Sequence, residues 1–468
     1  MSKAPSLYRR MPTPCSWTLC LRLASVLLAT WIELSAVRGL MKRTFADGAP
    51  LRLILFNIGA LFSGTASARF LSVIATVLVT RAVGPEQYGS YASVFAVARI
   101  ASVFFSLGLD GWLLQQGASA DGEKNALPQR LTTSLVIQTG LGLIWLILLA
   151  VFDGMWGNHW FPPRLLLVGA IAIFFEELTY TGWTAFKVTL DNRMTFILML
   201  AFQASQLFLF GALYASHVTD VYLYMIARDL VSAGGAAMAL VVVWRRIGFM
   251  FVPQEVGRTL RATVPYALSM VLALVYGRAD ITIAGMRLGP ASAGFYAPAV
   301  TLVMALSLIP GAIYGVMLPW TSRTYRVTPT KLPVIARNLF IWSALLGIFL
   351  ALVLFFIADP LVLFLYGEQF AASSALLRIL SGVIALRTLN FSVAAIIVAI
   401  GLQGRRVTAQ AVAALFNVTA NLLFIDVFGL PGVAIIYCAS ELILLLGYAS
   451  IWYAFMRLQT FTSGDNAP

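Results

Sequence analysis

Long apolar runs recur along most of the chain and are separated by short polar segments. A membrane-spanning helix needs about 20 mostly apolar residues, and twelve runs from residue 50 onward meet that requirement. They lie near residues 55–79, 88–110, 128–152, 165–186, 194–216, 221–244, 262–286, 293–318, 338–358, 375–400, 407–427 and 432–456. The pattern predicts an all-α integral membrane protein with twelve transmembrane helices and no connection long enough to hold a soluble domain.

The lysines and arginines of the connecting segments orient these predicted helices. With the N-terminus in the cytoplasm, the cytoplasmic segments hold eighteen of them and the opposite face holds four, Arg81, Arg164, Arg287 and Arg378. Cytoplasmic loops of membrane proteins carry such an excess. The bias predicts a multi-pass protein of the inner membrane with both termini in the cytoplasm. It also accounts for most of the net charge of +13, so no nucleic-acid partner is expected.

One short motif, which contains a Gly-Pro pair, occurs twice in the chain. Residues 83–92 read VGPEQYGSYA and residues 288–297 read LGPASAGFYA, with five of ten positions identical at an offset of 205 residues. Each copy joins the first two helices of a set of six. In each copy Gly-Pro suits the end of one helix and the first turn of the next. The second glycine allows close helix contact, and the tyrosine suits the membrane interface.

Two sets of six helices with the same topology predict a parallel internal repeat. The expected division is an N-terminal six-helix half at residues 51–244, a basic cytoplasmic linker at 245–261, a C-terminal six-helix half at 262–457 and a cytoplasmic tail at 458–468. Residues 1–50 form a leader whose apolar run is interrupted by charges. The stretch MKRTFADG from Met41 has the form of a natural start, so we expect the leader to reflect a mis-assigned start site.

Four stretches carry a resemblance to a known family. They are TRAVGPEQYGSYA at 80–92, SLGLDGWLLQQ at 106–116, YGRADITIAGMRLGPASAGFYAPA at 276–299 and FLYGEQFAASSALLRIL at 364–380. Over residues 52–457 the chain resembles the polysaccharide-exporter branch of the MATE-like transporter superfamily, although the long leader departs from the family pattern.

The resemblance implies a MATE-like fold and an alternating-access flippase for undecaprenyl-pyrophosphate-linked oligosaccharides. Such flippases serve O-antigen, capsule or exopolysaccharide assembly. Membrane lipids surround the protein, and the polysaccharide polymerase and the glycosyltransferases of the same pathway are the further partners that the resemblance implies.

Arginines inside the predicted helices are candidates for binding the pyrophosphate. Charged groups within a span cost about 2.5–3.5 kcal/mol at a helix centre, so they usually face a cavity or one another. Guanidinium groups match phosphate oxygens in geometry and charge. The predicted substrate-binding residues are therefore Arg69, Arg99, Arg278 and Arg387.

Carboxylates inside the spans are candidates for coupling transport to an ion. Asp280 and the adjacent pair Glu176 and Glu177 could carry a proton or a sodium ion. The alternative is that the arginines pair with these three carboxylates and hold helices together. Which gradient drives transport, and which sugar is carried, are left open by the sequence.

Catalytic, metal and cofactor sites are not predicted. The chain has two histidines and three cysteines, without metal-ligand spacing. No GxxxxGK[ST] run and no Asp-x-Asp is present. A membrane glycosyltransferase or polymerase is therefore disfavoured, and a transporter rather than an enzyme is expected. Two transporter alternatives remain, a MATE-type drug or cation antiporter and a peptidoglycan-precursor lipid flippase, although the latter usually has two additional helices.

Overall fold

The computed structural model describes residues 51–118, 126–156 and 164–464, and the regular elements in these ranges are all helices. The whole predicted leader, residues 1–50, and the last residues of the predicted tail lie outside the described residues. Residues 60–468 form one compact unit, which is the unit described below. In chain order the helices are α3 Leu51–Ala101, α4 Val103–Ser106, α5 Leu109–Ala118, α6 Ala126–Trp156, α7 Leu165–Val188, α8 Asn192–Ala215, α9 Val221–Arg246, α10 Pro253–Leu288, α11 Pro290–Leu306, α12 Leu308–Val327, η1 Pro329–Lys331, α13 Leu332–Tyr366, η2 Glu368–Phe370, α14 Ala372–Ala399 and α15 Gln403–Gly464.

Ten helical segments within the described ranges are long and apolar enough to cross a membrane. The longest, Gln403–Arg457, has 55 residues. Straight, it would measure about 80 Å, more than twice the hydrocarbon core of about 30 Å. It is broken at Gly429, and the segment Thr65–Ser106 is broken at Gly84. The predicted all-helical membrane architecture is confirmed, whereas the count of twelve crossings stays a prediction.

Both copies of the repeated turn adopt the same backbone conformation. Gly84 has φ 76° and ψ 176°, and Gly289 has φ 89° and ψ 167°. This region of positive φ and extended ψ is open essentially to glycine alone. Pro85 and Pro290 follow, and Pro290 occupies the first turn of α11, where its missing N–H is not needed. The predicted role of Gly-Pro in ending one helix and beginning the next is therefore confirmed.

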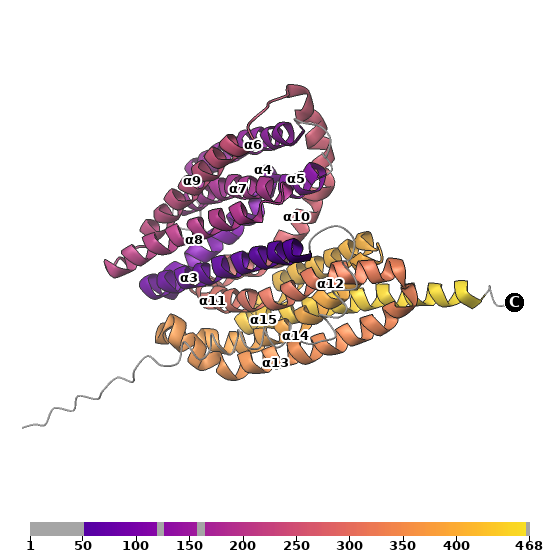
Figure 1. Cartoon of the computed structure of the whole chain (residues 1–468). Coiled ribbons are helices and arrows are strands. Elements are labelled where there is room, and N and C mark those ends of the chain that lie inside the picture. Colours follow the sequence, from indigo (N-terminus) through magenta and orange to yellow (C-terminus); the bar gives the residue numbers. More distant parts are fainter. Residues whose placement is uncertain (1–50, 119–125, 157–163, 465–468) are drawn as a thin grey trace, which may run out of the picture. The chain divides into compact units, whose positions relative to one another are not determined.

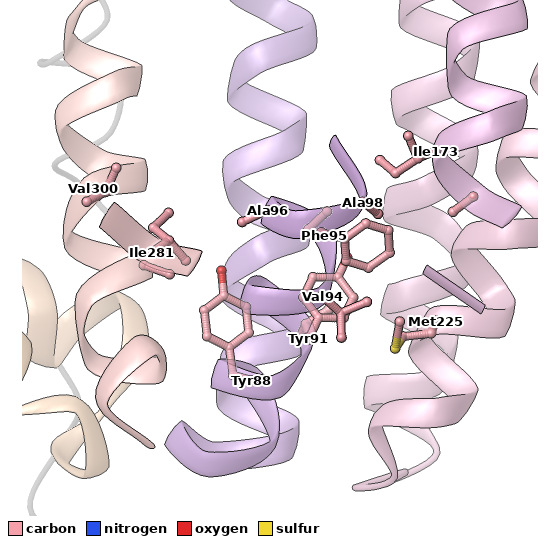
Figure 2. Packing of buried hydrophobic residues seen from close by; sticks show 14 of the residues in the cluster. Tyr88, Tyr91, Val94, Phe95, Ala96, Ala98, Ile173, Met225, Ile281 and Val300 are labelled. Carbon is pink, nitrogen blue, oxygen red and sulfur yellow. The ribbon is translucent and has the colours of Figure 1, made fainter. Parts of the chain in front are cut away.

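We call residues 60–246 the N-terminal half and residues 253–457 the C-terminal half. The part of α3 after Gly84 contacts both. In Figure 2, Val94 and Phe95 face Ile173 and Met225 of the N-terminal half, whereas Tyr88 and Ala96 face Ile281 and Val300 of the C-terminal half. In the C-terminal half α14 packs against both α13 and α15, beside which it runs in Figure 1.

The second glycine of each repeated turn explains how closely the halves meet. A Cβ atom built on Gly89 would lie 1.7 Å from the carbonyl oxygen of Pro290. Reciprocally, a Cβ on Gly294 would lie 1.8 Å from the carbonyl oxygen of Pro85. The two copies of the motif therefore pack on each other, and each needs the other's glycine.

The connection between the halves is short. Helix α9 ends at Arg246 and α10 begins at Pro253. The predicted linker at 245–261 thus includes the first turns of α10, and the proposed division into halves at this linker stays a prediction.

Candidate functional site

A charge network inside the N-terminal half joins three helices. Arg99 of α3 donates from Nη1 to Oε1 of Glu177 at 2.5 Å and also pairs with Glu176, both on α7. Arg228 of α9 pairs with Glu176 Oε1 at 2.8 Å. The two glutamates are 2% and 3% exposed, so their charges are compensated by arginine rather than by water.

Two tyrosines border this network. Tyr91 accepts a hydrogen bond from Nη1 of Arg228 at 2.8 Å, and the Arg99 guanidinium lies 5.4 Å from the ring centroid of Tyr180. In the C-terminal half, the Tyr296 hydroxyl donates to Oδ2 of Asp280 at 2.7 Å. Tyr91 is 7% exposed and Tyr296 is fully buried. These phenols therefore satisfy charged groups inside the protein, whereas their depth at the membrane interface stays a prediction.

A second network lies in the C-terminal half. Arg387 of α14 donates to Oε1 of Glu441 on α15, from Nε at 2.9 Å and from Nη2 at 2.5 Å. Nη2 also donates to the Tyr437 hydroxyl at 2.7 Å, and Asn390 donates to Oε2 of Glu441 at 2.7 Å. In the order of the predicted spans within each half, α14 takes the place of α7, and the part of α15 after Gly429 takes the place of α9. An ion pair joins these two helices in both halves, but the acid and the base have exchanged places.

Asp280 differs from the buried glutamates. It is 2% exposed, and its carboxylate accepts hydrogen bonds from the Tyr296 hydroxyl and from its neighbour's backbone N–H, Ile281 N, at 2.8 Å. Within the described residues it forms no salt bridge, so the alternative pairing of Arg278 with Asp280 is not formed.

Arg69 of α3 and Arg278 of α10 have exposed side chains. Neither guanidinium has a hydrogen-bond or salt-bridge partner in the part of the chain that the structure describes. Arg278 is nevertheless within electrostatic range of Arg69, Arg99 and Arg228. Three of the four arginines predicted from the sequence thus gather in one region, while Arg387 lies in the C-terminal network.

Asp110 was missed by the sequence reasoning, although it stands inside the stretch SLGLDGWLLQQ. It lies on α5, outside the ten apolar segments. Its Oδ1 accepts a hydrogen bond from the Thr181 hydroxyl at 2.6 Å, and the Thr181 oxygen lies 2.9 Å from Oε1 of Gln138.

Among the described residues, no group of three or more His, Cys, Asp or Glu side chains is placed to hold a metal ion. The groups that are placed together are guanidiniums, carboxylates and phenols. Such a set can bind an anion or exchange protons.

Comparison with known proteins yields a family and a fold. The sequence profile of the family described as "Polysaccharide biosynthesis protein" matches residues 54–325. No curated protein matches the sequence significantly. Lipid II flippase MurJ, in an inward closed conformation, is similar with a TM-score of 0.68 at 16% identity, over 83% of this chain and 86% of that one.

Two MATE transporters are also similar. An inward-facing multidrug resistance MATE family transporter gives a TM-score of 0.67 at 16% identity, over 85% of this chain and 96% of that one. A eukaryotic MATE transporter gives 0.58 at 12% identity, over 86% and 95%. These likenesses confirm the predicted MATE-like transporter fold.

Proposed function

Since the chain belongs to the polysaccharide biosynthesis protein family and has the fold of membrane flippases and transporters, we propose that it translocates undecaprenyl-pyrophosphate-linked oligosaccharides. The protein is a multi-pass membrane transporter and not an enzyme. The proposed route crosses the inner membrane by alternating access between the two halves. Glycosyltransferases would supply the lipid-linked unit, and a polymerase would consume it in O-antigen, capsule or exopolysaccharide assembly.

The observation that carries this proposal is the unpaired state of Arg69 and Arg278. Their guanidiniums are exposed and close enough to repel each other, and neither forms a salt bridge among the described residues, although Asp280 lies within electrostatic range of Arg278. An anion between them would relieve that repulsion, and a pyrophosphate offers oxygens that match guanidinium geometry. Because α3 and α10 come from different halves, both halves would hold the substrate.

The other two predicted binding arginines take different roles in this proposal. Arg99 is already engaged by Glu176 and Glu177, so we assign it to holding α3 and α7 together. Arg387 donates its hydrogen bonds to Glu441 and Tyr437, and we assign it to holding α14 and α15 together.

Ion coupling is proposed to use Asp280. Asp280 is buried and forms no salt bridge among the described residues, which favours its protonated form, whereas Glu176 and Glu177 are paired directly with arginines. Among the three predicted coupling residues, Asp280 is therefore the best placed to bind and release a proton.

The experiment is complementation of a flippase-deficient strain, scored by surface polysaccharide, with membrane abundance measured alongside. Arg69→Ala and Arg278→Ala should each lower export at least about tenfold, the loss of one charge-assisted contact, at unchanged abundance. Arg→Lys at either position should restore part of the export, because lysine keeps the charge but loses the planar fork.

The matched control is Arg245→Ala, an exposed arginine at the end of α9, which should export normally. Normal export by both Arg69→Ala and Arg278→Ala would show that these residues do not hold the pyrophosphate. Rescue of a strain lacking its peptidoglycan-precursor flippase, or efflux of organic cations, would instead identify one of the two alternative substrates.

A further inference from the structure

An arginine outside the charge networks connects the two halves at one end of the molecule. Arg81 lies on α3, three residues before the break at Gly84. Its Nε donates to the carbonyl oxygen of Leu365 at 2.7 Å, and its Nη2 donates to the carbonyl oxygen of Phe364. Both carbonyls belong to the last turn of α13, which ends at Tyr366.

The last carbonyls of a helix lack intrahelical donors and carry the negative end of the helix dipole. A guanidinium supplies both the missing donors and the compensating positive charge. Arg81 is thus a C-terminal cap for α13 that comes from the other half of the protein. A weaker contact runs the opposite way, from Gln369 Nε2 to the carbonyl oxygen of Arg81 at 3.4 Å.

The end of α13 is itself fixed to the rest of the C-terminal half. The Tyr366 hydroxyl donates to the carbonyl oxygen of Pro298 on α11 at 3.4 Å. Ser373 of α14 donates to the carbonyl oxygen of Phe295, also on α11, at 2.7 Å. The end of α13 that Arg81 caps is therefore linked to α11, to which the start of α14 is also linked.

Apolar contacts surround the polar ones. Tyr88 and Phe370 meet edge to face with ring centroids 6.4 Å apart, and Gly89 packs against Pro290. These contacts are close-packed, whereas Arg81 is exposed. Water could replace the hydrogen bonds of Arg81 if the halves separated, so breaking this contact would leave no buried group unpaired.

We propose that Arg81 is a positioning residue for transport, which keeps the outer ends of the two halves together until the substrate is to be released there. The inference rests on the proposed alternating-access transport and assigns a residue to its closed outer state. The positive-inside bias places Arg81 on the outer face.

The test measures the separation of the outer ends directly. Spin labels are placed on cysteines at Glu86 and Glu368, both exposed, in protein whose native cysteines are replaced by serine. Distances are recorded by double electron–electron resonance in lipid nanodiscs without substrate. We expect Arg81→Ala to raise the ratio of separated to closed molecules by about tenfold, the effect of losing charge-assisted hydrogen bonds, and Arg81→Lys to give an intermediate ratio.

Arg164→Ala is the matched control, because Arg164 is exposed on the same predicted face and its side chain forms no hydrogen bond or salt bridge with the other described residues. It should leave the distances unchanged. An unchanged distribution in Arg81→Ala would overturn the proposal, as would an equal shift in Arg164→Ala. If the alanine variant does not survive purification, Arg81→Gln takes its place with the same criteria.

The outcome does not depend on which substrate the protein carries. The distances are measured without substrate, so a failure of the oligosaccharide proposal leaves this expectation intact. Conversely, an overturned role for Arg81 leaves the Arg69 and Arg278 assay unaffected.

Discussion

Single arginines inside the membrane-spanning helices fall into two groups that their sequence context does not separate. Arg99 and Arg387 are bound to buried glutamates, whereas Arg69 and Arg278 are exposed and lack described partners. Removing one member of a buried ion pair leaves the other charge uncompensated and costs far more than removing an exposed charge. Stability and transport should therefore respond differently in the two groups.

Arg99→Ala should destabilise the protein by about 3–5 kcal/mol, because Glu177 would keep only the Ser102 hydroxyl at 3.2 Å as a side-chain donor. Arg69→Ala should change stability by no more than about 0.5 kcal/mol. Thermal unfolding in one detergent measures both. An equal loss in the two variants would mean that Arg69 also has a structural partner.

Much of this residue-level pattern was not predictable from the sequence. The sequence offered pairing of the arginines with Glu176 and Glu177 as an alternative, and Arg99 forms it, but the sequence could not choose this alternative because the pairing joins positions 77 and 78 residues apart and depends on how α3 and α7 pack. The hydrogen bond from Arg228 to Tyr91 was not predicted, because an aromatic residue near a turn fits the membrane interface as well as it fits a buried hydrogen bond. Only the folded chain shows which of these applies.

At the level of elements, the sequence predicted helix ends better than it predicted side-chain contacts, because a backbone position that requires positive φ is occupied by glycine. The repeated Gly-Pro predicted two helix breaks, and Gly84 and Gly289 both have positive φ. The sequence could not show that the second glycines, Gly89 and Gly294, contact the opposite copy. That contact depends on the two halves meeting, which no local pattern encodes.

Gly89→Ala and Gly294→Ala should each cost about 1–3 kcal/mol, as overpacking does, and should lower export. The added carbon would lie under 2 Å from a backbone carbonyl oxygen of the other half, so the helices must move apart. Gly234→Ala on α9 is the matched control, because a Cβ there meets nothing within 4 Å. It should be neutral or slightly stabilising. Thermal unfolding and surface polysaccharide report the two effects, and a neutral Gly89→Ala would contradict the close contact.

At the level of the whole molecule, the orientation of the chain in the membrane is still a prediction. The fold is established by its likeness to membrane transporters, but the cytoplasmic position of the termini rests on the distribution of lysine and arginine alone. The segment around η1 is basic, whereas the turn at Gly289 is not followed by basic residues before α12. These two segments should therefore lie on opposite sides of the membrane.

A cysteine at Ala291 should react with an impermeant thiol reagent added to intact cells, and a cysteine at Thr330 should react only after the cells are permeabilised. Both positions are exposed, and native cysteines are replaced by serine in each variant. The opposite labelling pattern would reverse the orientation, and labelling of both in intact cells would remove the crossing between them.

The reciprocal contact of the two glycines has the form of an isologous interface, in which residue i of one copy meets residue j of the other and j meets i. Such contacts are usual between identical subunits, where every substitution appears on both sides of the two-fold axis. Here the two copies share one chain and can vary independently. The N-terminal half pairs an acid on α7 with a base on α9, and the C-terminal half pairs a base on α14 with an acid on α15 at the corresponding places. In a homodimer both subunits have the same sequence, so the acid and the base would stand at the same positions in each. The exchange of acid and base between the two ion pairs is therefore possible only because the two halves are separate parts of one chain.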